Sequence, residues 1–141
     1  MKKKILELSF AFILLFLSSC VTTADSLSQD LSSQELIQRA QNASSNNNLR
    51  NAEFIYNEVL NRFPLDNEAV CNAKYEIAFI HYKQRKWDIS RSEFSDILDR
   101  YKKNDAALLP SKFKVLAQIV IDKIDVIKAP KKGSKQKSDL D

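Results

Sequence analysis

The sequence predicts an all-α fold in which antiparallel helical hairpins stack as a short solenoid, followed by a C-terminal capping helix. Apolar residues recur at spacings of three and four over most of the chain, and the breaks between these segments are short and polar. The chain holds one glycine, and no alternating apolar and polar run bounded by turns indicates a strand. We therefore expect helices and no sheet.

Five helices follow from this periodicity. Residues Ser32 to Glu35 have the form of a capping box, in which the serine accepts from a backbone N–H and the glutamate reaches back. Pro64 ends the second helix because proline has no N–H to donate, and Asp66 fits the N-cap of the third. Pro110 suits the first turn of the fifth helix. The expected ranges are about 33–44, 49–62, 67–85, 88–102 and 110–128.

The first four helices pair into two hairpins that share a residue pattern. The matching positions are Ala40, Ala52, Tyr56 and Val59 in the first hairpin and Ala78, Ser90, Phe94 and Ile97 in the second. Small residues let the two helices of a hairpin approach, and the aromatic side chain fills the space beside the next hairpin. The pattern resembles the tetratricopeptide repeat (TPR) in two copies over about residues 33–102. The copies lie 38 residues apart, whereas the family repeats every ~34, and the long third helix absorbs the additional turn.

The N-terminal segment has the pattern of a secretory signal. A start with three lysines precedes the apolar run 8–17, which is about half of the ~20 residues that a membrane-spanning helix needs. Its end, Leu17-Ser18-Ser19-Cys20, resembles a bacterial lipobox. That resemblance implies cleavage between Ser19 and Cys20 and acylation of the cysteine. The alternative is an ordinary signal peptide with a chance cysteine.

Four segments are therefore expected. They are a removed lipoprotein signal peptide at 1–19, a flexible tether at 20–31, a TPR-like helical domain at 32–128 and a basic disordered tail at 129–141. Removal of 1–19 takes away three lysines and one glutamate, so 19 basic and 17 acidic residues remain, a net charge of about +2. Four of these lysines lie in the tail, and the domain has no basic face for nucleic acid. We interpret the tail as a solvated end, with anionic lipid or cell-wall polymer as the alternative ligand.

Residue types that carry chemistry are sparse. His81 is the only histidine and takes a place usually filled by a core aromatic, so we expect a packed or half-buried imidazole. With Cys20 acylated, Cys71 has no partner for a disulfide, and we expect a half-buried apolar side chain there. The histidine has no companions for a zinc site, no glycine-rich loop is present, and no serine has an identifiable base. The sequence predicts no catalytic residue, metal, cofactor or small-molecule substrate.

Two helices carry a second apolar stripe besides the one expected to face the core. The candidates for partner binding are Tyr75, Phe79 and Tyr82 on the third helix and Val115, Ile119 and Val126 on the fifth, where Asp122 interrupts the stripe. For the third helix, the alternative is burial on two sides. For the fifth, a terminal capping helix should be polar on its outer side, so the stripe indicates a partner or a dimer contact.

Three segments together resemble BamD, the lipoprotein subunit of the machine that inserts β-barrels into bacterial outer membranes. They are Arg62-Phe63-Pro64, the run from Tyr75 to Lys83, and Asp99-Arg100-Tyr101. The resemblance implies a scaffold on the outer membrane, lipid-anchored and facing the periplasm, that binds the periplasmic domains of a BamA-like barrel protein. BamD has five repeats, so the contacts of its later repeats do not transfer. The alternatives are a cell-envelope, division or peptidoglycan-associated TPR adaptor and a surface-exposed lipoprotein.

Overall fold

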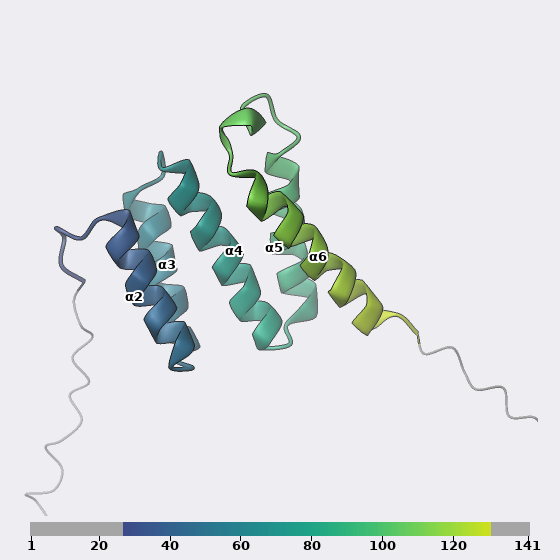
Figure 1. The fold of residues 1–141 in the computed structure, drawn as a ribbon. Coiled ribbons are helices and arrows are strands. Elements are labelled where there is room, and N and C mark those ends of the chain that lie inside the picture. Colours follow the sequence, from purple (N-terminus) through teal and green to yellow (C-terminus); the bar gives the residue numbers. More distant parts are fainter. Residues whose placement is uncertain (1–26, 131–141) are drawn as a thin grey trace, which may run out of the picture. The chain divides into compact units, whose positions relative to one another are not determined.

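The computed structural model describes residues 27–130, and a helical domain begins at Leu31 (Figure 1). Residues 27–30 belong to a separate unit, in which 29 and 30 form a turn. The helices in chain order are α2 (Ser33–Ser45), α3 (Leu49–Arg62), α4 (Asn67–Lys83), α5 (Trp87–Arg100), the 3₁₀ helix η1 (Ala106–Leu108) and α6 (Ser111–Lys128). Since residues 27–130 contain no strand, the all-α prediction is confirmed. The predicted signal peptide, Cys20 and residues 131–141 of the tail lie outside the described residues.

The predicted helix starts have the expected hydrogen bonds. The Ser32 hydroxyl accepts from the Glu35 N–H at 3.3 Å, while the Ser32 N–H donates to the Glu35 carboxylate at 2.9 Å. The Asp66 carboxylate accepts from the Ala69 N–H at 3.0 Å and from the Ser33 hydroxyl at 2.8 Å. Asp66 therefore caps α4 and also joins the start of α2 to the start of α4, which the sequence did not indicate.

In the second hairpin, both helices end two residues earlier than predicted. α4 ends at Lys83 because Arg85 adopts a φ of +60°, which is outside the right-handed helical region. α5 ends at Arg100, where backbone hydrogen bonds between residues three apart replace the α-helical pattern. The connection to α6 contains the unpredicted 3₁₀ helix η1, and α6 itself starts at Ser111, directly after Pro110.

Each helix packs against the next along the chain, and α4 also contacts α2 and α6. The first helices of successive hairpins therefore lie side by side, in the order α2, α4, α6 (Figure 1). This is the arrangement of a short TPR-like solenoid of two hairpins, α2–α3 and α4–α5, with α6 packed against the second hairpin.

The repeated positions form the contacts within and between the hairpins. Ala40, Ala52, Tyr56, Val59, Ala78, Ser90 and Phe94 are fully buried, and Ile97 is 4% exposed. Where the first hairpin has Ala52, the second has Ser90, whose hydroxyl donates to the Ala78 carbonyl at 2.9 Å. This bond satisfies the buried Ser90 hydroxyl between α4 and α5. The residue pattern that predicted the repeat is thus the pattern of its core.

His81 connects three helices. Its side chain is buried, as expected, with Nδ1 2.7 Å from Glu93 Oε2 of α5 and Nε2 3.4 Å from Glu53 Oε1 of α3. The two second helices, α3 and α5, therefore both lie along α4. The sequence indicated a packed imidazole but not its two carboxylate partners.

Candidate protein-binding surface

The aromatic stripe of α4 lies between neighbouring helices. Tyr75, Phe79 and Tyr82 are half-buried and pack against a core cluster formed by α4, α5 and α6. The rings follow one another with centroid distances of 6.0 Å from Tyr75 to Phe79 and 5.5 Å from Phe79 to Tyr82. Tyr75 also meets Phe94 of α5 at 5.4 Å and Phe113 of α6 at 5.9 Å. This aromatic row joins the second hairpin to α6.

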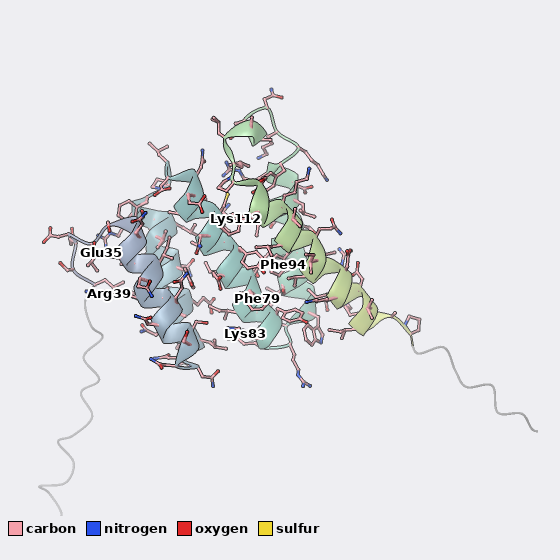
Figure 2. All side chains as sticks on the ribbon, in the orientation of Figure 1. Glu35, Arg39, Phe79, Lys83, Phe94 and Lys112 are labelled. Carbon is pink, nitrogen blue, oxygen red and sulfur yellow. The ribbon has the colours of Figure 1, made fainter. Side chains whose placement is uncertain are left out.

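These contacts favour packing of α4 on two sides, which was one of the two interpretations of its pattern, with each of the three rings half-buried. Phe79 is partly covered as well, because the Lys83 ammonium lies 5.3 Å from its ring centroid (Figure 2). Parts of these rings stay exposed, so partner binding by Tyr75, Phe79 and Tyr82 stays a prediction. Their packing role is what the contacts establish.

The second stripe of α6 points away from the domain. Val115, Ile119 and Val126 are 60%, 44% and 76% exposed, and at 3.6 residues per turn they fall within about 40° of one another. The buried residues of α6 occupy the opposite side of the helix: Phe113, Ala117, Val120, Ile121 and Ile124. Leu116 and Ile127 are also exposed. α6 is thus apolar on two opposite sides, and no described helix covers the second.

An open groove runs beside this stripe. It has a volume of about 580 Å³ and lies between the end of α5 and the first half of α6. Its lining consists of Leu98, Tyr101, Lys102, Lys114, Val115, Gln118 and Ile119. Two of the six predicted residues, Val115 and Ile119, therefore lie together in a groove, whereas Val126 lies two turns farther along α6. The contribution of α5 to this groove was not predicted.

Tyr101, which lines the groove, connects the two helices that form it. Its hydroxyl donates to the Pro110 carbonyl at 2.6 Å, which ties the end of α5 to the start of α6. Burial, together with the neighbouring Cys71 thiol, raises the pKa of Tyr101 to about 12, so the phenol stays protonated. Burial likewise raises the pKa of the Cys71 thiol, which packs against Leu109 and Phe113. A buried thiol with a raised pKa is a poor nucleophile, in line with the expected packing role.

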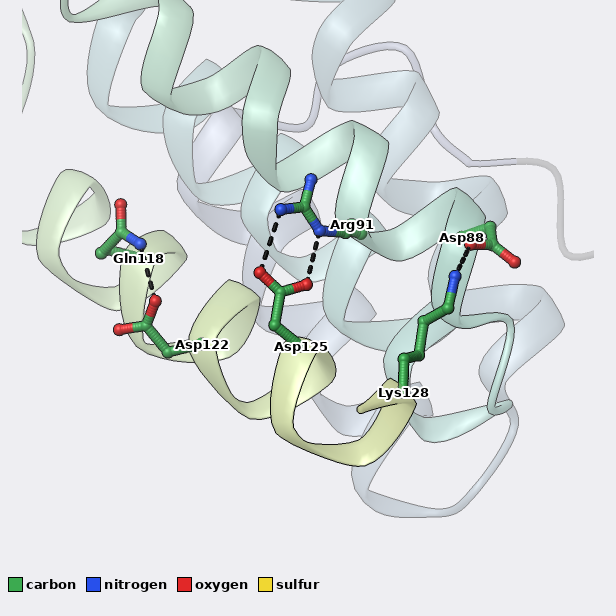
Figure 3. Close-up of polar contacts among 6 residues, drawn as sticks. All are labelled: Asp88, Arg91, Gln118, Asp122, Asp125 and Lys128. Carbon is green, nitrogen blue, oxygen red and sulfur yellow. Dashed lines mark hydrogen bonds and ion pairs between the residues drawn. The ribbon is translucent and has the colours of Figure 1, made fainter. Parts of the chain in front are cut away.

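Ion pairs attach α6 to its neighbours along both edges of the buried face. Arg91 of α5 donates two hydrogen bonds to Asp125, at 2.6 and 3.0 Å, and the Lys128 ammonium pairs with Asp88 (Figure 3). The hydrogen bonds from Arg91 lower the pKa of the Asp125 carboxyl. At the other end, Lys112 pairs with Glu68 of α4. The buried apolar face of α6 turns the opposite stripe outward, and these exposed ion pairs add a small contribution.

Polar chemistry elsewhere is limited. Burial raises the pKa of Glu76 on α4, which is close to the buried Tyr56 hydroxyl. Among residues 27–130, no group of three or more His, Cys, Asp and Glu side chains is arranged to hold a metal ion. In the same range, no helix combines the length and apolar character that crossing a membrane requires.

Comparison with known proteins finds a similar chain in a spirochaete. The sequence is 31% identical over 111 residues to an uncharacterized protein of Treponema pallidum (strain Nichols). The match covers 77% of this chain and 44% of that protein, so this chain spans less than half of its relative. No protein-family model and no solved structure match the sequence. The fold and surface described above therefore carry the functional argument.

Proposed function

We propose that this chain is a lipid-anchored scaffold that binds partner proteins in the periplasm. The observation that carries the proposal is the apolar face of α6, which stays exposed beside the apolar α5–α6 groove. An exposed apolar surface on a folded domain commonly marks a protein-binding site. Stacked hairpins suit such a task because they present extended surfaces on a rigid frame. We expect binding and no catalysis.

The partner that we propose is an integral outer-membrane protein of β-barrel assembly, bound through its periplasmic domains. Support comes from the resemblance to BamD. Arg62-Phe63-Pro64 closes the α2–α3 hairpin, residues 75–83 form the second half of α4, and Asp99-Arg100-Tyr101 ends the second hairpin. The proposed location is the outer membrane, with the helical domain on its periplasmic side.

The lipid anchor at Cys20 completes the proposed mechanism. Two or more acyl chains give stable membrane attachment where one chain is marginal. A tether of about ten residues then holds the domain at a high effective concentration near an integral membrane partner. A scaffold of two hairpins depends on this gain, because its own contact area is small.

We predict that Cys20→Ala abolishes function in cells while leaving the fold unchanged. Loss of the acyl chains removes the effective-concentration gain without touching any contact of the helical domain. The measurements are complementation of a deletion strain, membrane fractionation, and circular dichroism of the purified variant. Full activity of the unanchored, periplasmic form would contradict the role of the anchor.

Photo-crosslinking in cells tests the partner. A photoreactive amino acid at Ile119, followed by pull-down, is expected to recover a large barrel protein with periplasmic domains, whereas the same probe at the exposed Leu65 recovers none. Recovery of cell-wall synthases in its place would assign the chain to a peptidoglycan-associated adaptor. Protease treatment of intact cells separates both from a surface-exposed lipoprotein, because a periplasmic domain survives it.

A further inference from the structure

The groove beside α6 lies where the repeat would continue. His81 of α4 contacts Glu53 of α3 and Glu93 of α5, so the second helices of both hairpins run along α4. By the same geometry, the second helix of a third hairpin would run along α6 next to α5. Leu98 and Tyr101 of α5 and Val115 and Ile119 of α6 line a groove at that place, and no described residue fills it.

The apolar surface has the length of a helix. Ile119 is the last residue of α6 that lines the groove. The exposed stripe continues from there to Val126, which is 76% exposed. Val126 follows Val115 by eleven positions, which corresponds to about 16 Å at 1.5 Å per residue, or three helical turns. An elongated partner with apolar side chains at helical spacing matches this surface, because such a helix places an anchor in the groove and others along the stripe.

The charges around this surface indicate which helix fits. Lys102 and Lys114 line the groove, and Lys123 flanks the stripe on the other side of α6. Lys102 pairs with Asp99 at 2.6 Å, whereas Lys114 and Lys123 have no ion pair among the described residues. Of the nearby acids, Asp125 is bound by Arg91, and Asp122 accepts a hydrogen bond from Gln118 at 2.8 Å (Figure 3).

The same charges disfavour two other occupants. A second copy packed through α6 would bring Lys114 and Lys123 of each chain toward those of the other, and the exposed Asp122 within the stripe would be set against the apolar stripe of the partner. Residues 131–141 contain four lysines and two aspartates, so this segment would also add mainly positive charge. Like charges facing each other across an interface oppose association.

We propose that the α5–α6 groove and the outer stripe of α6 bind an amphipathic helix of a partner protein, with apolar anchors and acidic flanks, as the second helix of a third hairpin. The inference rests on the proposed scaffold function, since it names the partner segment that the scaffold holds. The anchors contact Leu98, Val115 and Ile119, and the flanking carboxylates meet Lys114 and Lys123. Completion of the hairpin covers the apolar side of α6 that the described chain leaves open.

Two synthetic peptides test this proposal on the full-length chain in detergent. Both are amphipathic helices of about four turns with the same leucine positions, and they differ in having glutamates or lysines on the flanks. Fluorescence anisotropy is expected to show that the glutamate peptide binds at least about tenfold more tightly than the lysine peptide. Equal affinities, or no binding of either peptide, would overturn the proposal.

Variants locate the binding site. Ile119→Ser is expected to weaken glutamate-peptide binding by about tenfold, as loss of a central apolar anchor does. The double variant Lys114→Glu with Lys123→Glu is expected to reverse the preference between the two peptides. The control Leu65→Ser changes a residue that is 93% exposed on the α3–α4 connection and is expected to change nothing. Unchanged binding of the Ile119 variant would overturn the assignment to this face.

Two further outcomes would assign the face to another occupant. If sedimentation shows a dimer that Ile119→Ser dissociates, the occupant is a second copy. If deletion of residues 131–141 is required before either peptide binds, the occupant is that segment. These results are independent of the in-cell crosslinks. Recovery of a different cellular partner would contradict the β-barrel assembly proposal but leave the peptide preference intact. Loss of the peptide preference would contradict the helix proposal but leave the crosslinked partner unchanged.

Discussion

α4 and α6 have similar apolar patterns but lie in different surroundings. Each is the first helix after a hairpin, and each carries apolar side chains on two sides. On α4 the second stripe is partly covered: Tyr75 contacts Phe94 of α5 and Phe113 of α6. On α6 the side chains of the second stripe, such as Val126, stay exposed because no described helix follows. The position of a helix in the stack, more than its own pattern, decides whether a second stripe becomes core or surface.

The largest expected effect that tests this difference is at Tyr75. We predict that Tyr75→Ala lowers the free energy of unfolding by about 3 kcal/mol, the lower end of the range for a core aromatic, since the ring is half-buried. The substitution removes the ring contacts that join α4, α5 and α6. Urea denaturation monitored by circular dichroism measures the change, and Tyr75→Phe, which keeps the ring, is the control. An unfolding midpoint like that of the unsubstituted chain would show that the α4 stripe is a surface after all.

A matched pair of substitutions compares the two sides of α6. Val120 is 4% exposed and Val126 is 76% exposed, so the same change can be made on opposite sides of one helix. We predict that Val120→Ser costs about 2 kcal/mol, because it opens a cavity and buries a hydroxyl. Val126→Ser is expected to change the free energy of unfolding by less than about 0.5 kcal/mol. Equal losses would mean that the outer stripe is covered in the native protein.

The comparison also explains what could be predicted from sequence. The helices, the Ser32 capping box, the Asp66 N-cap and the buried repeat positions depend on spacing along the chain, and spacing is visible in a sequence. The stripes of α4 and α6 look alike at that level. Their different burial depends on helices brought together by folding, as do the carboxylates of Glu53 and Glu93 beside His81.

The α5–α6 groove shows the same limit. Val115 and Ile119 were identifiable because they break the expected polar outer side of a terminal helix. Leu98 and Tyr101 were not, because their spacing assigns them to the core face of α5 and the groove exists only where that face meets α6. A signal was present in part: the aromatic Tyr101 begins a connection of ten residues, 101–110, where a short turn would be usual.

A smaller loss of stability than those at Tyr75 and Val120 is expected at the start of α4. α4 has a side-chain cap in Asp66, whereas α6 follows Pro110 without a side-chain cap. We predict that Asp66→Ala lowers the free energy of unfolding by about 1 kcal/mol at neutral pH. Asp66→Asn is the control, since asparagine also accepts from the Ala69 N–H and caps about as well as aspartate. Urea midpoints of the three proteins measure the cap.

A decrease in pH separates the contribution of the Asp66 charge from that of its capping hydrogen bond. Its pKa is lowered, first by the hydrogen bond from the Ala69 N–H and then by that from the Ser33 hydroxyl. A carboxyl with a lowered pKa stabilises the fold at every pH above its unfolded value of about 3.9, and this contribution is lost as the pH falls through the folded value. Between pH 7 and about pH 3, the unsubstituted chain should therefore lose more stability than Asp66→Asn, which carries no proton to titrate at this site. Identical pH profiles would show that the carboxylate charge adds nothing to the hydrogen bonds with which residue 66 caps α4.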